Sequence, residues 1–128
     1  MPEASYPDDL LYHPDHDWAR IEGDVATFGI TWHAQDALGE VVFCEPPALG
    51  TQLTQDEPYT EVESVKAVSD VIAPLSGEVI EANAALGDAP EAINTDPYGA
   101  GWLVKVRLSD PGQASALLAA DAYVALLS

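Results

Sequence analysis

The side chain with the clearest chemical potential is Lys66, one of only two lysines among 128 residues. Glu61 and Glu63 alternate with Val62 before it, and a stretch rich in valine and isoleucine follows it, so strand-like segments flank it on both sides. We therefore expect Lys66 at or beside the tip of a β-hairpin. The turn type stays open, because no Asn-Gly or Asp-Gly pair marks it. A projecting lysine suits covalent modification, although most turn lysines are plain solvated charges.

The second lysine, Lys105, offers a direct comparison. It lies in a segment whose alternation places Val104, Val106 and Leu108 on one face and the cations on the other. Lys105 therefore has the pattern of an ordinary outward strand lysine. Many carboxylates surround Lys66 in sequence and favour its ammonium form, so its acylation would need an enzyme and an activated donor.

Composition narrows the class of protein. The length predicts one domain, residues 1–128, with a loose N-terminal segment over residues 1–9. A formal net charge of −18 argues against nucleic acid and anionic membranes as partners. The chain shows neither an 18-residue apolar run nor a secretory signal. The single cysteine, Cys44, excludes an internal disulfide, fits a reducing compartment, and is expected in or near the core. We expect a cytoplasmic monomer.

A second group of polar residues follows the N-terminal segment. His13, Asp15, His16 and Asp17 are the residue types that bind metals, but their spacing matches no closed ligand set and Pro14 interrupts them. No serine, cysteine or carboxylate constellation in the chain has the arrangement of a catalytic site. We therefore expect no metal centre and no enzyme activity.

Short strands separated by turn residues dominate the pattern and predict a mainly β fold, a β-sandwich or flattened barrel. One short helix follows the first hairpin, because Thr31 can cap it and Gly39 can end it. A further helical turn is expected at residues 89–94. Asp110-Pro111 begins a C-terminal helix to about Leu118, and Asp121 caps another. The expected strands are Trp18–Glu22, Val25–Ile30, Gly39–Glu45, Thr51–Leu53, the two strands of the Lys66 hairpin and Trp102–Leu108.

A short internal sequence repeat supports the prediction of two facing sheets. Gly39-Glu40-Val41-Val42 recurs as Gly77-Glu78-Val79-Ile80, and an Ala-Leu-Gly turn follows each copy. The two copies lie 37 to 38 residues apart along the printed sequence. Such a repeat favours two similar half-sheets that face each other, although it is short enough to arise by chance.

The motif around Lys66 resembles the lipoyl-attachment hairpin of the H proteins of the glycine cleavage system. The resemblance runs from about Leu10 to the C-terminus, and it is the combination of its pieces that is specific. Those pieces are Asp17-Trp18, Gly29-Ile30-Thr31, His33-Ala34-Gln35, Leu38 to Phe43, Glu63 to Asp70, Ser76 to Val79, Asp96-Pro97-Tyr98 and Gly101-Trp102-Leu103.

The resemblance implies a lipoyl/biotinyl-type barrel-sandwich hybrid that acts as a non-catalytic carrier. Lys66 would bear lipoate in amide linkage, and Glu63, Val65 and Ala67 would form the recognition surface around it. Glycine decarboxylase (P protein) would load the arm with an aminomethyl group, aminomethyltransferase (T protein) would pass its carbon to tetrahydrofolate, and dihydrolipoyl dehydrogenase (L protein) would reoxidise the dithiol. A lipoate ligase or a lipoyl/octanoyl transferase would attach the cofactor.

The resemblance also implies a cleft that shelters the loaded arm. Matching positions suggest Asp15, Asp17 and Asp70 in this cleft, with His33 nearby, because carboxylates bind a cationic aminomethyl group by charge-assisted hydrogen bonds. Two positions depart from the family. Asp17 stands where Glu is more frequent, so its carboxylate lies about 1.5 Å further back. Trp32 stands where an acid or amide is usual, and it can serve as a partner anchor or pack under the helix.

Other readings of the same lysine stay open. A lipoyl domain of a 2-oxoacid dehydrogenase would be shorter, would carry Asp-Lys-Ala at the tip and would be tethered by a linker. A biotinyl domain would place methionines beside the lysine, whereas Met1 is the only methionine here. A lipoate relay without a role in glycine metabolism would use the same lysine, and only a loading assay or the genomic neighbourhood would separate it from a carrier.

Overall fold

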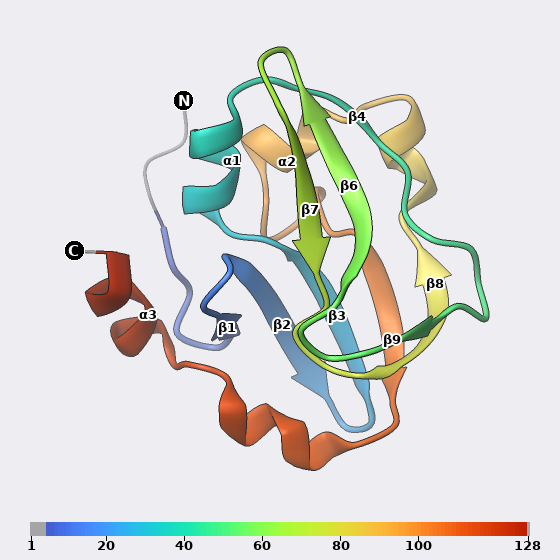
Figure 1. Ribbon diagram of the computed structural model, residues 1–128, viewed down its shortest axis with the longest axis vertical. Coiled ribbons are helices and arrows are strands. Elements are labelled where there is room, and N and C mark those ends of the chain that lie inside the picture. The colour runs from blue at the N-terminus through green and yellow to red at the C-terminus, as the bar shows by residue number, and fades with distance from the viewer. Residues whose placement is uncertain (1–4, 128) are drawn as a thin grey trace.

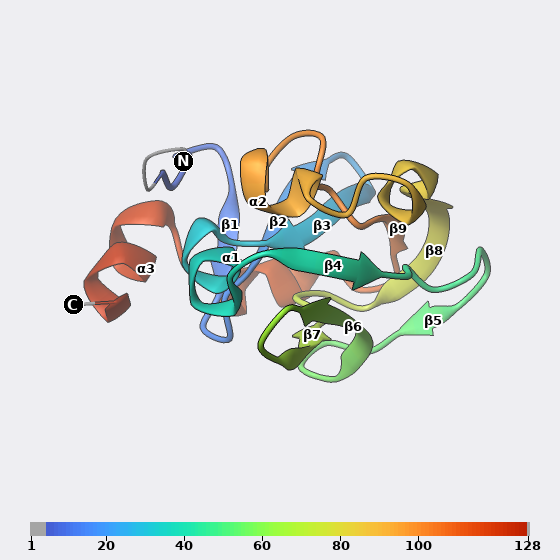
Figure 2. The same cartoon turned by 90° about the horizontal axis from the view of Figure 1, so that it is seen from above.

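The computed structural model describes residues 5–127 as two antiparallel sheets that pack face to face, with short helices at their margins (Figures 1 and 2). The larger sheet has six strands in the order β1-β2-β3-β9-β8-β5, and the smaller sheet has the order β4-β6-β7. The predicted flattened sandwich is confirmed. The strands are β1 (Leu11–His13), β2 (Asp17–Glu22), β3 (Val25–Ile30), β4 (Val41–Cys44), β5 (Gln52–Leu53), β6 (Pro58–Ser64), β7 (Val68–Ile72), β8 (Gly77–Ala82) and β9 (Val104–Leu108).

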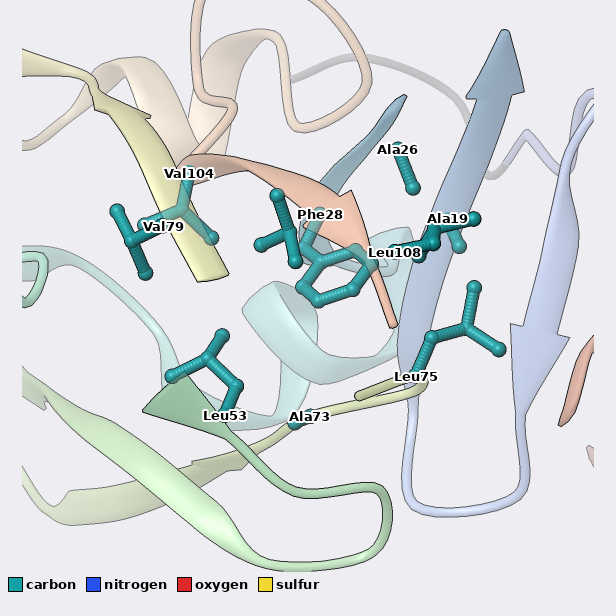
Figure 3. Packing of buried hydrophobic residues seen from close by; sticks show 10 residues of the cluster. Ala19, Ala26, Phe28, Leu53, Ala73, Leu75, Val79, Val104 and Leu108 are labelled. Atoms are coloured by element: carbon teal, nitrogen blue, oxygen red, sulfur yellow. The ribbon is translucent and has the colours of Figure 1, made fainter. Parts of the chain in front are cut away.

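The core lies between the two sheets and follows from strand alternation. Val104, Val106 and Leu108 of β9 are buried as predicted, while Lys105 points outward to an ion pair with Glu81 at 3.9 Å. Figure 3 shows the Phe28 ring in the middle of one apolar cluster, among side chains from strands of the six-stranded sheet and from the segment that joins β7 to β8. Each fully buried valine, leucine or phenylalanine side chain of the core stabilises the fold by about 1.5–3 kcal/mol.

The helix after the first hairpin forms where the sequence predicts it. Helix α1 (Trp32–Leu38) begins after Thr31, whose side chain accepts a hydrogen bond from the Ala34 amide. It ends at Gly39, which has a φ of 80°, a conformation that glycine adopts without a steric penalty. The expected helical turn at residues 89–94 is found slightly later, as α2 (Ala92–Thr95). A 3₁₀ turn, η1 (Ala84–Gly87), precedes it.

The C-terminal helices differ from the prediction. Residues Pro111–Ala116 form a 3₁₀ helix, η2, capped by Asp110 as expected, and this helix ends before Leu118. The reason is tertiary: Leu118 pairs with Tyr12 through two backbone hydrogen bonds of 2.8 Å, which requires an extended backbone there. Local capping signals cannot reveal such a long-range bridge.

The last helix also differs from the prediction in its start. Helix α3 (Ala120–Leu127) begins two residues before the helix that an Asp121 cap would start, so Asp121 lies in its first turn and does not cap it. Tyr123 is buried and Leu127 packs at the edge of the same cluster, whereas Val124 is 42% exposed.

The internal sequence repeat that begins at Gly39 and Gly77 can be compared with the two sheets. The repeated motif supplies β4 to the small sheet and β8 to the large one, so its two copies lie in different sheets.

Residues 1–4 of the expected loose segment lie outside the described residues. Residues 5–9 form no helix or strand, and Tyr6 packs edge-on against Tyr12 and Tyr123. No helix within residues 5–127 has the length and apolarity needed to span a lipid bilayer.

Trp18 depends on a glycine for its place in the core. Trp18 and Gly29 are paired across β2 and β3, and the buried indole donates a hydrogen bond to the Pro97 carbonyl oxygen at 3.0 Å. A Cβ atom added to Gly29 would lie 2.6 Å from three atoms of the indole ring. The sheet therefore accepts only glycine at this position without moving the tryptophan.

We expect Gly29→Ala to lower the free energy of unfolding by about 1–3 kcal/mol, because the added methyl group overpacks the indole. Urea denaturation followed by tryptophan fluorescence measures the change. Gly87→Ala is the matched control, since nothing lies within 4 Å of a Cβ there. Equal stabilities of the two variants would contradict the packing argument.

Candidate functional site

The turn that joins β6 to β7 is the tip of a projecting hairpin (Figure 1). Lys66 lies in this turn, as predicted, and its side chain is exposed. Ser64 shapes this turn: its hydroxyl oxygen accepts hydrogen bonds from the amides of Lys66 at 3.3 Å and Ala67 at 3.1 Å. The Ser64 amide also donates to the Ala67 carbonyl oxygen at 2.8 Å. The tip is therefore held by its own short hydrogen bonds, and Lys66 projects from an ordered turn.

A further bond ties the hairpin tip to the body of the protein. The Val65 amide donates to the Glu40 carbonyl oxygen at 3.0 Å, just after α1 ends. The Lys66 stem then passes over Gly39, with Cε 3.4 Å from the position that a Cβ of Gly39 would take. Of the predicted recognition residues, Val65 is 67% exposed, Ala67 is also exposed, and Glu63 is half-buried in β6.

A cleft of about 450 Å³ opens directly beside this tip, between α1, β7 and the turn before β2. It contains all four residues that the sequence suggested for it, Asp15, Asp17, His33 and Asp70. Segments far apart in the chain thus meet at one place. The remaining lining residues are His16, Ile30, Ala34, Ala37, Leu38, Val62, Ala67, Val68, Ser69 and Val71.

Asp17 is the buried carboxyl of this cleft, with only 2% of its surface exposed. Its Oδ2 atom has no hydrogen-bond partner among the described residues. Burial raises the pKa of Asp17 well above its ordinary value, the negative charge of Asp15 adds to the rise, and a hydrogen bond from the Ile72 amide opposes it. Within residues 5–127, no lysine or arginine forms an ion pair with a cleft carboxylate.

His16 is a cleft residue that the sequence did not identify as one. Its Nδ1 atom is 2.7 Å from the Tyr123 hydroxyl, which is itself 2.8 Å from the Thr31 hydroxyl. The His16 and His33 rings are 4.4 Å apart, and burial together with His33 lowers the pKa of His16, although Asp15 opposes the change. Helix α3 thus supports the cleft wall through Tyr123. In the sequence, the position of His16 between Asp15 and Asp17 was the only signal that could have predicted His16 as a cleft residue.

The N-terminal histidines do not form a metal site. His13 turns away from the cleft: its Nε2 atom lies 2.6 Å from Asp56 Oδ1, while Nδ1 accepts a hydrogen bond from the Asp15 amide at 3.0 Å. No group of three or more potential ligands converges anywhere in residues 5–127. Cys44 is buried as predicted, and burial raises its pKa to about 12, so it is a core residue and not a reactive thiol.

The fold and the site together define a class of protein. A β-sandwich that presents one ordered lysine at a hairpin tip, beside a cleft lined with carboxylates, has the form of a carrier for a covalently attached arm. A chemical group attached to Lys66 would begin at the edge of that cleft, because Ala67 and Val68 line it.

Comparisons with known proteins identify the family. The glycine cleavage H-protein family model matches residues 10–128. A glycine cleavage system H protein of Rubrobacter xylanophilus is 57% identical over 107 residues, covering 84% of this chain and 85% of that protein. One of Halorhodospira halophila is 52% identical over 126 residues, covering 98% and 97%. The crystal structure of a Mycobacterium marinum homologue superposes with a TM-score of 0.85 at 44% identity, covering 93% and 96%. The chain belongs to the glycine cleavage H-protein family.

The raised pKa of Asp17 predicts a characteristic dependence of stability on pH. Folded Asp17 holds its proton to a higher pH than unfolded Asp17, so the folded state binds more protons above pH 4 and stability falls as pH rises. Asp17→Asn does not titrate. Its stability relative to wild type should therefore rise between pH 4 and pH 8, by about 1.4 kcal/mol for each unit of difference between the folded and unfolded pKa.

Urea denaturation of both proteins at several pH values measures this difference. Asp88→Asn, which removes an exposed carboxylate remote from the cleft, is the charge-matched control. A difference between Asp17→Asn and wild type that does not change with pH would show that Asp17 titrates normally in the folded protein.

Proposed function

We propose that this chain is the lipoyl carrier of the glycine cleavage system, with lipoate in amide linkage on Lys66. The observation that carries the proposal is the position of Lys66: it is exposed at an ordered hairpin tip, at the margin of a cleft that contains a buried and partly unpaired carboxyl. Membership of the H-protein family supports the same assignment. The carrier has no catalytic residues of its own in this proposal.

In this proposal the β6–β7 hairpin presents Lys66 to the enzyme that modifies it. Ser64 orders the turn and the Val65 amide anchors it to Glu40, so a ligase meets a lysine whose backbone is already in place. Glu63, Val65 and Ala67 would form the surface that a lipoate ligase or a lipoyl/octanoyl transferase recognises. Attached lipoate would supply a disulfide that accepts the aminomethyl group of glycine. Lysine and lipoate together span roughly 12–14 Å, if bonds near 1.5 Å are summed along a staggered chain.

In this proposal the cleft shelters the aminomethyl group that the arm carries. Asp15, Asp17 and Asp70 place three carboxyl groups around one space, and a cationic aminomethyl group would be held there by charge-assisted hydrogen bonds. The walls from Ile30, Leu38, Val62 and Val71 are apolar and would exclude water from the bound group. His16 and His33 border the same space, so they would complete the binding surface on the side of α1.

The surface charge would guide the partners. A net charge of −18 would steer the carrier toward basic docking patches on glycine decarboxylase, aminomethyltransferase and dihydrolipoyl dehydrogenase. The same charge opposes self-association, so the carrier would act as a monomer. We place it in the cytoplasm, where these enzymes and reduced thiols would be found in a bacterial cell.

Attachment is tested by the intact mass of the protein from cells that are supplied with lipoate. We expect wild type to carry one lipoyl increment, and Lys66→Arg to carry none, because it lacks the primary amine that forms the amide. Lys105→Arg is the matched control and should be modified like wild type. A lipoyl group on Lys66→Arg would remove Lys66 from its role.

Loading distinguishes a carrier from a lipoate relay. The lipoylated protein should gain an aminomethyl group when it is incubated with glycine and glycine decarboxylase, detectable by mass. A protein that is lipoylated but never loaded would indicate a relay.

A further inference from the structure

The turn between β1 and β2, residues 14–16, supplies Asp15 and His16 to the cleft, although it is neither helix nor strand. The His16 amide donates a hydrogen bond to the His13 carbonyl oxygen at 2.9 Å, and the Thr31 amide donates to the His16 carbonyl oxygen at 3.1 Å. His16 has a φ of 75°, a conformation that residues other than glycine seldom adopt. The turn therefore depends on bonds from its surroundings to keep this shape.

The side chain of His13 supplies two further bonds, one through each ring nitrogen. The Asp15 amide donates to Nδ1 at 3.0 Å, and Nε2 lies 2.6 Å from Asp56 Oδ1. Because a backbone amide can only donate, Nδ1 must be unprotonated, so the ring proton is on Nε2 and is donated to the Asp56 carboxylate. The ring is buried, with 8% of the side chain exposed. A neutral imidazole thus bridges a backbone amide and a carboxylate.

Asp56 connects this bridge to the other sheet. It lies in the loop between β5 and β6, and its amide donates to the Ala73 carbonyl oxygen at 2.9 Å, just after β7 ends. The Ala73 amide donates in turn to the Glu57 carbonyl oxygen at 2.9 Å. The cleft is lined by β7 from the small sheet and by the 14–16 turn, which leads into β2 of the large sheet. The His13 ring therefore joins two parts of the cleft wall that come from different sheets.

The residues on either side of this bridge share an unusual backbone conformation. Within residues 5–127, His16 and Asp56 are the only residues besides glycines with a positive φ, 75° and 74° respectively. Such conformations persist where the surrounding structure holds them, and they are frequent at functional sites. One of them lies next to each end of the His13 bridge, which indicates that the bridge helps to hold both loops in shape.

We propose that His13 is a positioning residue that fixes the Asp15 side of the cleft, because its ring ties the 14–16 turn to the loop at the end of β7. His13 does not line the cleft itself and acts through Asp15, whose amide it binds. The inference rests on the proposed carrier function for its effect on the loaded arm. Loss of the bridge would free the turn, so Asp15 and His16 would leave their places and water would reach the group that the arm carries.

The protonation of the His13 ring gives the first test, on the unmodified chain. Two-bond ¹H–¹⁵N correlation spectra of histidine-labelled protein distinguish the two ring nitrogens. At about pH 8, above the ordinary histidine pKa, we expect a proton on Nε2 of His13 and none on Nδ1. A proton on Nδ1, alone or together with one on Nε2, would exclude the bond from the Asp15 amide and overturn the proposal.

Asp56 offers a matched pair of variants, because both remove its charge. Asp56→Gly removes the acceptor and suits a φ of 74°, so the loop should fold as before. Asp56→Asn keeps an oxygen that can accept from Nε2, and asparagine tolerates the same φ. We expect the Asp15 amide to exchange with solvent about fivefold faster in Asp56→Gly, the change that loss of one hydrogen bond brings, and at the wild-type rate in Asp56→Asn. Equal exchange in the two variants would contradict the bridge.

The loaded arm gives the functional readout. Each variant is lipoylated, loaded from glycine by glycine decarboxylase, separated from that enzyme and followed by mass as it loses the aminomethyl group. Asp56→Gly should lose the group about fivefold faster than wild type, and Asp56→Asn should restore retention.

A double variant separates the bridge from a general effect on the loop. In His13→Asn the side chain ends short of Asp56, so adding Asp56→Gly should cause no further loss of retention. Additive effects of the two substitutions would show that His13 and Asp56 act independently, and the proposal would fail.

These outcomes distinguish the positioning role from the carrier function. If glycine never loads the lipoylated chain, the carrier function fails, and the bridge is judged by the His13 protonation state and by the exchange of the Asp15 amide. If loading succeeds but Asp56→Gly and Asp56→Asn lose the aminomethyl group at equal rates, the carrier function stands and the positioning role is refuted.

Discussion

The packing of the small sheet on the large one is the constraint from which the rest of the structure follows. Val62 of β6 and Val71 of β7 are fully buried, so both strands of the Lys66 hairpin are held by their inward faces. Their shared turn then extends beyond the core, where the Ser64 hydrogen bonds and the bond from the Val65 amide to the Glu40 carbonyl oxygen order it. An exposed lysine on a rigid base results, and this combination suits a residue that must be reached by one enzyme and must carry its group to others.

The cleft keeps a polar group in a place where an apolar one would be more stable. A sandwich could fill the space near Asp17 with an apolar side chain, yet this one keeps a buried carboxyl there whose Oδ2 atom has no hydrogen-bond partner among the described residues. Leaving a buried polar atom unpaired costs about 1–3 kcal/mol. The well-packed clusters between the sheets can offset such a cost, because each large apolar side chain contributes a similar amount. The unpaired Asp17 atom lies in the cleft beside Lys66.

The C-terminal segment contributes to the site from a distance. Leu118 extends the β1 edge by pairing with Tyr12, and this pairing positions α3 so that Tyr123 reaches His16 and Thr31. The ring of Tyr123 stacks on Tyr12 with centroids 4.8 Å apart, which holds its hydroxyl in place. One wall of the cleft is thereby tied to the last helix, although more than 100 residues separate His16 from Tyr123 in the chain.

The sequence alone determined those features of this protein that depend on residues close to one another in the chain. Alternation in β9, the Thr31 cap, the Gly39 stop and the Lys66 turn depend on neighbouring residues, so their patterns could be read directly. The motif around Lys66 also indicated the family and the acidic residues of the cleft. The early end of η2, the bulge at Tyr59 and the burial of Asp17 were decided only by tertiary structure. The first depends on the pairing of Leu118 with Tyr12, the second on the register of β6 against β7, and the third on segments far apart in the chain that meet around the cleft. No local pattern encodes these pairings.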